Sequence, residues 1–413
     1  MNSRERVLAA LNHEEPDRVA VDLGGHRSSG MHVIAYKKLR EYLGLAPSKL
    51  FIYDLIQQLA IIENDVLDIF GIDVVELGHN FYNLNEYWQD WELDDGTTCK
   101  IPAFIKVEKT QDGNVVYGDE EQVICIQKKG CLFFEQTYFP FLNSNDFAFK
   151  NLPYHLQQIM WVRLGMPPAP AGFDEEGLRI WRDTAVNIRK STDRAIYGTF
   201  GGNLIEIGEF AFRMDNFLYS LAAEPTRVHT FLDKLVEIHL KNLDKYLDAT
   251  AEYIDIIGFG DDFGTQQGPQ ISPKMYQEFF KPRHKVLWDY VKQRAPHLKI
   301  SLHSCGGIYP LIRDLIEAGV DAINPVQFTS KDMCLHKLKK EFGKDLTLWG
   351  GGCDTRSILP FGTPEEVKPH VKENVKILSP GGGFVFQQVH NIMAEVPPQN
   401  VVAMFEALRE INN

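Results

Sequence analysis

Long apolar runs are missing from this chain of 413 residues. No uninterrupted apolar stretch approaches the roughly 18 residues that a membrane-spanning helix needs. The first 19 residues also lack the apolar core of a signal peptide, and we therefore expect a cytoplasmic protein. Cysteine is scarce as well, because six cysteines are too few for a disulfide framework in a chain of this length. Reduced thiols serve as metal ligands, as nucleophiles or as small core residues.

An excess of positive charge is also absent. The formal net charge is −13, whereas a nucleic-acid surface needs clustered lysine and arginine. The composition therefore argues against a nucleic-acid partner. Internal repeats and low-complexity segments are not found either. With 44% hydrophobic and 24% charged residues, the sequence has the composition of an ordinary globular protein.

What the sequence does contain is a recurring pattern of short apolar segments, each followed by a helical pattern. Eight such segments are predicted strands, at residues 18–25, 72–78, 195–202, 253–262, 298–305, 320–325, 346–351 and 383–391. Continuous apolar runs are typical of strands that are covered on both faces. Eight strands with their helices predict an α/β fold, a (β/α)8 TIM barrel. A doubly wound open sheet would give the same alternation and is the alternative.

The pattern changes between residues 82 and about 153. Short alternating runs are separated there by Asp-Gly turns, which are typical of antiparallel hairpins. We therefore predict a single barrel domain over residues 1–413, with an inserted β-hairpin and linker region at 80–165 after the second strand. A proline-rich linker near residues 165–172 follows, since its prolines cannot continue a helix.

Polar side chains follow most of the predicted strands, where catalytic groups lie in (β/α)8 enzymes. They are His26, Arg27, Asn203, Asp261, Asp262, His303, Cys305, Asn324, Cys353, Asp354, His390 and Asn391. The opposite ends of the strands show no comparable set. This asymmetry predicts an enzyme.

His303 and Cys305 form a His-x-Cys pair at the end of the fifth strand. Zinc binds neutral imidazole and thiolate, and a catalytic zinc uses three protein ligands and keeps one position open. Cys353 and His390 stand at neighbouring strand ends, so the four residues together predict a metal site. The alternative is that His303 only hydrogen-bonds and Cys305 only packs in the core.

The other candidate residues have more than one interpretation. Cys353 lies in the glycine-rich stretch WGGGCDT, which could form either a tight turn or a loop that approaches a ligand. Asp261 and Asp262 could act as ligand, as general base or as partner of a histidine, or could cap the next segment. The remaining candidates are His26 and Asn324 for catalysis, and Arg27, Asn203 and Asn391 for substrate binding.

Several motifs together resemble those of the uroporphyrinogen decarboxylase superfamily. They are DRVAVD near the start, DDFGTQQGPQISPKMYQEFFKP, LHSCG, GVDAINPVQ, the stretch from GGGCDT to LPFGTPEEV, and SPGGGFVFQQVHNI. The resemblance covers the start and nearly all of residues 250–413, but not the predicted hairpins. It implies a (β/α)8 barrel, in agreement with the strand pattern.

Two branches of this superfamily differ in their motifs. Uroporphyrinogen decarboxylases are metal-free and carry an arginine-rich motif after the first strand, where this sequence has Arg27 alone. The sequence is more similar to the zinc methyltransferases that work with corrinoid proteins. These carry His-x-Cys where His303 and Cys305 stand.

The methyltransferase branch also carries a third ligand, a cysteine in a Pro-Gly-Cys-Gly turn. We match this turn to SPGGG, which places Gly382 at the position of that cysteine. On this match Cys353, His390 or Asp262 would have to complete the zinc site.

The resemblance implies a methyltransferase that depends on zinc and on cobalamin. The cobalamin would be carried by a separate corrinoid protein, because the chain has no Asp-x-His-x-x-Gly motif. We expect O-demethylation of a small methoxylated compound, or demethylation of another methylated compound, in anaerobic metabolism. The alternatives are a metal-free decarboxylase, in which Asp261 or Asp262 steers protonation of a pyrrole-like ring, and a barrel that only binds a partner.

Overall fold

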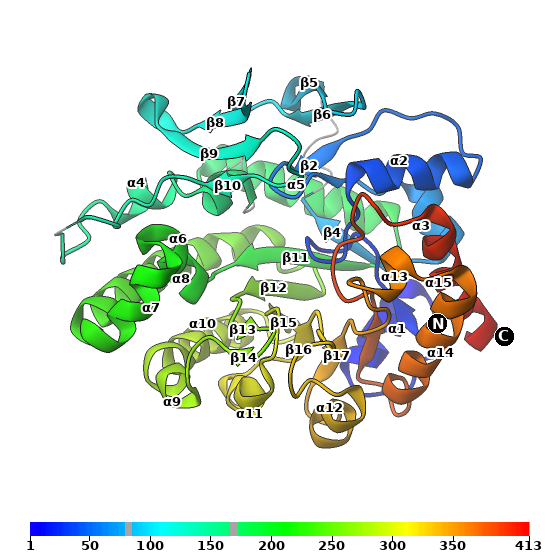
Figure 1. Cartoon of the computed structure of the whole chain (residues 1–413). Coiled ribbons are helices and arrows are strands. Elements are labelled where there is room, and N and C mark those ends of the chain that lie inside the picture. Colours follow the sequence, from blue (N-terminus) through cyan, green and yellow to red (C-terminus); the bar gives the residue numbers. More distant parts are fainter. Residues whose placement is uncertain (79–84, 145, 166–171, 413) are drawn as a thin grey trace.

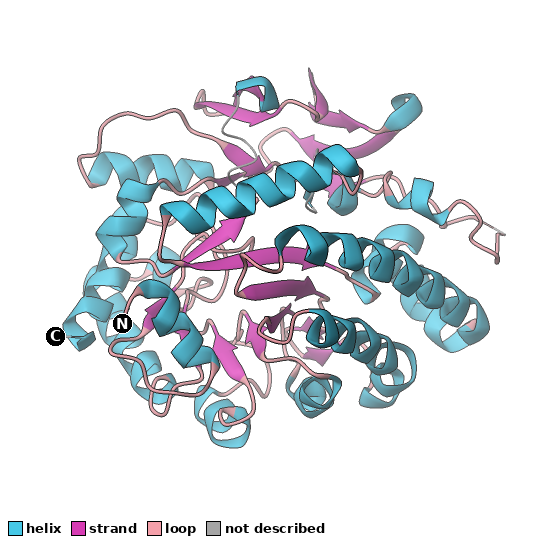
Figure 2. Cartoon of the chain, turned by 180° about the vertical axis from the view of Figure 1, so that it is seen from behind, coloured by secondary structure: helices cyan, strands magenta, loops and turns pink. Residues whose placement is uncertain are grey.

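A parallel sheet of eight strands forms the centre of the molecule (Figure 1). The computed structural model describes residues 1–78, 85–144, 146–165 and 172–412. The strand order is β1-β18-β17-β16-β15-β12-β11-β4, and every neighbouring pair is parallel. Helices surround this sheet, as both views of the chain show (Figures 1 and 2). The sheet is a nearly closed barrel, consistent with the predicted (β/α)8 fold.

Each barrel strand lies inside a segment predicted from the sequence. The strands are β1 (Ala20–Val21), β4 (Val74–Leu77), β11 (Ala195–Gly201), β12 (Ile256–Gly260), β15 (Lys299–His303), β16 (Ala322–Asn324), β17 (Thr347–Trp349) and β18 (Phe384–Phe386). They are shorter than predicted because the polar residues at their carboxyl ends mostly stand in the loops that follow.

Helices stand in the connections between the barrel strands and after the last of them, and several pack apolar side chains on the outer face of the sheet. They are α2 (Val33–Tyr42), α3 (Asn64–Phe70), α4 (Leu152–Leu156), α5 (Glu175–Ser191), α6 (Ile205–Phe212), α7 (Met214–Ala223), α8 (Pro225–Thr250), α9 (Pro273–Met275), α10 (Lys281–Arg294), α11 (Ile312–Ala318), α12 (Leu335–Phe342), α13 (Ile358–Phe361), α14 (Pro364–Leu378) and α15 (Pro398–Asn412). Trp181, Phe231 and Trp288 are fully buried in this outer core. Within the described ranges, no helix combines the length and apolar character needed to cross a bilayer.

Two antiparallel sheets lie between β4 and β11 in the chain. One pairs β5 (Trp88–Glu92) with β6 (Thr98–Pro102); the other joins β7 (Lys106–Thr110), β8 (Gly113–Tyr117), β9 (Val123–Lys128) and β10 (Glu135–Gln136). The two Asp-Gly pairs of the sequence stand where β5 turns into β6 and β7 into β8. Most of the predicted proline-rich linker, 165–172, lies outside the described residues. Shorter strand pairs are β2 (Ile52–Asp54) with β3 (Leu59–Ala60), and β13 (Gly264–Thr265) with β14 (Gly268–Pro269).

Helix α1 (Ser3–Leu11) fills the amino end of the barrel. Its start is fixed by a capping box, in which Asn2 and Glu5 each bond the backbone of the other. Its buried side chains pack against inward-facing strand residues in one cluster: Val7, Ala10 and Leu11 with Ala20, Val74, Ala195, Tyr197, Ile256, Ala322, Trp349 and Val385. The barrel interior is therefore a packed core at this end.

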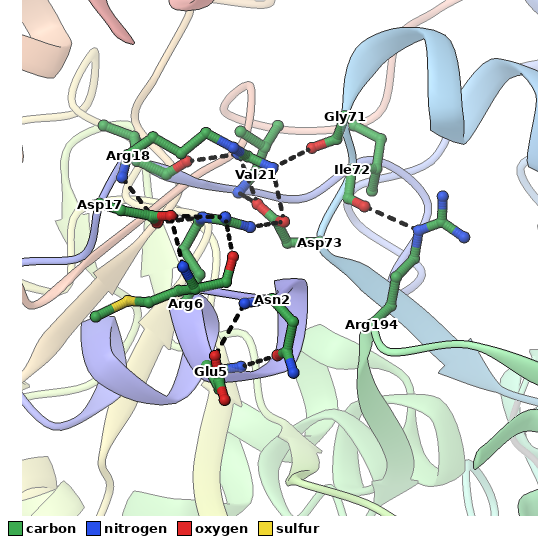
Figure 3. A network of polar contacts seen from close by, with 12 residues as sticks. Asn2, Glu5, Arg6, Asp17, Arg18, Val21, Gly71, Ile72, Asp73 and Arg194 are labelled. Carbon is green, nitrogen blue, oxygen red and sulfur yellow. Dashed lines mark hydrogen bonds and ion pairs between the residues drawn. The ribbon is translucent and has the colours of Figure 1, made fainter. Parts of the chain in front are cut away.

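Asp73 joins β1 and β4, the two ends of the strand order (Figure 3). Its buried carboxylate accepts hydrogen bonds from the Val21 backbone N–H at 3.0 Å, from Arg6 at 2.7 Å and from Arg18 at 2.8 Å. Its own N–H donates to the Val21 carbonyl at 2.8 Å. Such a buried charge is tolerated because it is paired and fully hydrogen-bonded.

The amino ends of the strands carry more polar groups than we predicted. Asp255 and Asp321 precede β12 and β16 as Asp73 precedes β4, and their carboxylates accept the backbone N–H groups of Ile196 and Ile300. The expectation that polar residues gather only at the carboxyl ends is therefore wrong. These aspartates bind neighbouring strands instead of a ligand.

We expect Asp73→Ala to lower the free energy of unfolding by about 3–5 kcal/mol, because it leaves buried partners of a charge network without their acceptor. Chemical denaturation measures the change. Asp90→Ala is the control, since Asp90 is 91% exposed and pairs with Lys100 at the surface; it should leave the free energy of unfolding nearly unchanged. Equal effects of the two variants would contradict a role for Asp73 in closing the barrel.

Candidate active site at the carboxyl end of the barrel

Three of the predicted metal ligands meet at the carboxyl end of the barrel. His303 ends β15, Cys305 follows two residues later, and His390 follows β18. One possible ligand atom from each residue lies within 4.8 Å of the other two, and Cys305 Sγ is 3.4 Å from His303 Nε2. Two imidazoles and a thiol are a donor set that suits zinc with one coordination position open.

Asn324, at the end of β16, fixes the proton on His303. The Asn324 Nδ2 group donates to the Trp349 carbonyl at 3.0 Å and to Gln387 Oε1 at 2.6 Å, so Oδ1 is the accepting atom of this amide. His303 Nδ1 lies 2.8 Å from Oδ1 and must therefore carry its proton. The lone pair of His303 is then on Nε2, the nitrogen near Cys305, as in histidines that bind a metal.

His26 belongs to the same hydrogen-bonded chain. Its Nε2 lies 3.0 Å from Gln387 Oε1 and 3.3 Å from Asp22, and its Nδ1 lies 3.1 Å from Ser28 Oγ. The Ser28 hydroxyl donates in turn to Asn324. Because both ring nitrogens of His26 already have partners, the structure favours a positioning role for His26 and Asn324 over the predicted catalytic one.

The local environment sets the protonation of the other two ligands. Burial lowers the pKa of His390 to about 3, and the neighbouring His303 and His26 add to this effect. His390 is therefore neutral, the form that binds metals. Burial also raises the pKa of Cys305 well above its usual value, with a further contribution from the carboxylate of Asp262. The thiol thus stays protonated unless a cation stabilises the thiolate.

Asp261 and Asp262 have different surroundings although they are adjacent. Asp262 lines the cavity of the site and accepts a hydrogen bond from the Cys305 backbone N–H at 2.7 Å. Asp261 is fully buried and accepts from the Leu204 N–H at 2.8 Å and from His284 Nε2 at 2.9 Å. Asp261 therefore anchors the start of α6, contrary to the catalytic role predicted for it.

The structure changes the prediction about the third ligand. Cys353 is not part of the cluster formed by the described residues: its buried Sγ lies 4.0 Å from the Asp354 carbonyl. Gly382 precedes β18, and a side chain at this position would meet the backbone of Glu14 near the amino end of the barrel. The match of SPGGG to the ligand-bearing turn was therefore wrong. His390, at the other end of β18, is the residue that lies with His303 and Cys305.

Two of the three residues predicted to bind substrate line the cavity, and the third does not. Arg27 and Asn203 line the cavity, and Arg27 Nη1 donates to Asp54 at 3.0 Å. Asn391 is buried and accepts a hydrogen bond from the Gly30 N–H at 2.8 Å. Asn391 therefore holds the loop after β1 and does not face a substrate.

A cavity of about 230 Å³ adjoins His303 and His390. Its further walls include Asp262, Glu206 and the aromatic side chains of Trp161, Tyr197, Phe210 and Phe259. Larger surface cavities lie near α2 and near α3, away from these side chains.

Glu206 was not predicted from the sequence. It stands in the first turn of α6, and its Oε2 accepts a hydrogen bond from Asn203 Nδ2 at 2.5 Å. Burial raises the pKa of Glu206 well above its usual value, and the nearby Asp262 and Asp261 add to the shift. The sequence does contain a signal for Glu206. It lies three residues after Asn203, which stands just beyond the carboxyl end of β11.

Sequence comparisons give the family of the chain. A family model described as uroporphyrinogen decarboxylase (URO-D) matches residues 207–411. The chain belongs to the uroporphyrinogen decarboxylase superfamily. The uroporphyrinogen decarboxylase of Synechocystis is 26% identical over 190 residues, 46% of this chain and 50% of that protein. That of Pseudoalteromonas translucida is 26% identical over 195 residues, 46% and 50% of the two chains. The chain thus spans about half the length of the curated relatives it matches.

A solved structure resembles the whole chain. A methyltransferase from Methanosarcina mazei superposes with a TM-score of 0.61 and 17% sequence identity, covering 100% of both chains. At this identity the similarity concerns the fold, and it agrees with the nearly closed barrel. The segment matched by the superfamily model contains His303, Cys305 and His390.

We expect Cys305 in metal-free protein to be alkylated slowly at about pH 8, because its raised pKa leaves little thiolate. The rate of alkylation should still be rising with pH beyond pH 9.

Asp262→Asn removes a negative charge that opposes ionisation of Cys305, so it should speed the alkylation roughly threefold to tenfold. Mass spectrometry of the labelled peptides measures the rates, with exposed Cys131 as reference. Asp289→Asn, on the exposed side of α10, is the control; equal rates in all three proteins would contradict the coupling of Asp262 to Cys305.

Proposed function

We propose that this chain is a zinc-dependent methyltransferase that works with a separate corrinoid protein carrying cobalamin. The observation that carries the proposal is the convergence of His303, Cys305 and His390 at the barrel mouth, within 4.8 Å of one another. A methyl-transfer reaction is also in keeping with the fold shared with the Methanosarcina mazei methyltransferase.

The chemistry of these three residues fits zinc. His390 is held neutral, and His303 presents an unprotonated Nε2 because Asn324 binds its Nδ1 proton. Cys305 is a buried thiol that ionises only beside a cation. Zinc bound there would act as a Lewis acid, lowering the pKa of an acceptor thiol or polarising the oxygen of a methyl ether. A thiolate ligand requires a reduced cysteine, which fits the cytoplasmic location expected from the missing signal-peptide core.

The residues around the ligands would prepare the site for a small substrate. Asp262 fixes the loop of Cys305 through the backbone N–H, and aromatic side chains supply an apolar wall of the cavity. A volume of about 230 Å³ suits a small molecule, since pockets for larger drug-sized ligands hold about 300–1,000 Å³. We therefore propose O-demethylation of a small methoxylated compound, or demethylation of another methylated compound.

The alternative is a metal-free decarboxylase, the activity named for the curated relatives. A porphyrinogen substrate carries many carboxylates and needs several cations to bind it. Arg27 is the only lysine or arginine among the described residues that line the cavity, and it donates to Asp54. Asp262 in the same walls would repel carboxylates, and Glu206 supplies no positive charge to bind them. The lining of the cavity therefore favours methyl transfer.

We expect about one zinc per chain in protein purified without oxygen. His303→Ala, Cys305→Ser and His390→Ala should each reduce the zinc content far below one per chain, because each removes one of three ligands. Cys353→Ser is the matched control and should keep the zinc, since this buried cysteine lies outside the cluster. Elemental analysis after dialysis gives the ratio; zinc that is retained by His303→Ala would refute the site.

Asn324→Ala tests the hydrogen bond that orients the ligand His303, through its effect on zinc affinity. It keeps all three ligands but removes the acceptor for His303 Nδ1, so zinc affinity should fall about 10–100-fold. Asn374→Ala is the control, a buried asparagine that bonds the Gly352 carbonyl instead. Competition with a zinc indicator reports both affinities.

Methyl transfer to added cob(I)alamin separates the two activities. The wild-type protein should convert cob(I)alamin to methylcobalamin in the presence of small methyl ethers, with a change in the visible spectrum. Cys305→Ser should lower this rate at least about a hundredfold, because it removes a ligand of the Lewis acid. Release of carbon dioxide from uroporphyrinogen, with no methylcobalamin formed from any methyl donor, would establish the decarboxylase instead.

A further inference from the structure

The cavity beside the proposed zinc ligands combines aromatic walls with a carboxyl group. Trp161 and Phe210 stack with ring centroids 6.2 Å apart and planes 26° apart, and Tyr197 and Phe259 line the same space. Glu206 enters the cavity from the first turn of α6. Aromatic faces and a carboxylate are the two kinds of group that bind an organic cation in proteins.

The Glu206 carboxyl group is only partly used by the protein. Oε2 accepts the hydrogen bond from Asn203, whereas no bond to Oε1 is found among the described residues. No lysine or arginine forms an ion pair with Glu206 in the described part of the chain either. The half-buried carboxyl group therefore lines the same cavity as Asp262 without a positively charged partner among the described residues, and a cation bound there would favour its ionised form over the neutral one.

A bound zinc ion would not serve as the positively charged partner that Glu206 lacks. One thiolate and two neutral imidazoles would leave zinc with a single positive charge, and Asp262, which accepts from the Cys305 backbone N–H and lies 3.5 Å from His303 Nε2, would offset that charge. Glu206 forms no hydrogen bond or ion pair with any of the three ligands in the described structure. Its Oε1 is therefore available for a group on the substrate.

We propose that the substrate carries a positively charged ammonium group, which Glu206 and the aromatic walls bind, while its methyl-bearing atom faces His303 and Cys305. This inference rests on the proposed methyltransferase function, since it assigns a substrate class to the same site. It makes Glu206 the residue that determines charge specificity. Small methyl ethers of amino alcohols belong to this class.

The test compares three ligands of similar shape with the zinc-loaded protein by titration calorimetry. The cation is 2-methoxyethyl-trimethylammonium, the neutral isostere is 1-methoxy-3,3-dimethylbutane and the anion is 3-methoxypropionate. We expect the cation to bind about tenfold more tightly than the neutral ether, because contact with aromatic faces and a carboxylate contributes at this scale. The anion should bind most weakly.

Glu206→Gln keeps the shape of the side chain and its acceptor for Asn203. It should reduce the preference for the cation to about twofold, the part that the aromatic walls supply. Glu237→Gln, an exposed position on α8, is the matched control and should leave the preference unchanged. Equal binding of cation and isostere by the wild type would overturn the inference, and so would a preference that survives Glu206→Gln. Tightest binding of the anion would also overturn it and would point to Arg27.

The same samples distinguish this inference from the proposed function. Zinc content and methyl transfer from the neutral ether are measured alongside binding. If both are present and no charge preference is seen, only the inference about the ammonium group fails. If zinc and methyl transfer are absent but Glu206 still selects the cation, the methyltransferase proposal fails and the cation site stands.

Discussion

Ion pairs to buried aspartates at the amino end of the barrel fix the positions of the strands. Arg4 and Arg6 lie on the same short helix, α1, and bind Asp255 and Asp73, which precede β12 and β4. Each aspartate also accepts a backbone N–H from a neighbouring strand, Ile196 in β11 or Val21 in β1. A shift of one residue in any of these strands would break these bonds and turn every side chain of the strand to the opposite face. The orientation of the polar groups at the other end depends on this register.

Because the strands keep this register, polar residues at their carboxyl ends form a continuous chain of hydrogen bonds. Asp22 lies beside His26, and His26 lies beside Gln387. Gln387 accepts a hydrogen bond from Asn324, whose Oδ1 accepts one from His303 Nδ1. These residues come from the ends of four different strands or the loops after them. The proton on His303 is therefore set by the barrel as a whole and not by the His-x-Cys pair alone. This explains how a weak sequence motif can correspond to a well-defined cluster.

The sequence was sufficient to predict the strands and the end of the barrel that carries the site, because apolar periodicity and chain order determine both. It could not show that Asp261 faces the outer helices while Asp262 lines the cavity, since both are adjacent polar residues after the same strand. Glu206 was missed because it stands on a helix, where an acidic residue in the first turn is usually only favourable for the helix dipole. The match at Gly382 was wrong because it compared only the residue types of two glycine-rich turns. The location relative to β18, before the strand or after it, is what places His390 in the cluster.

The packing of α1 inside the barrel also has a consequence for the order of events in a reaction. The amino end is blocked by Val7, Ala10 and Leu11, so in the described part of the chain the carboxyl end is the side from which the cavity is reached. Two reactants that both act at His303 and Cys305 must then share one entrance. Either the smaller one enters first and is covered by the larger, or the first must leave before the second arrives. The kinetic order of such an enzyme is thus limited by the helix that seals its opposite end.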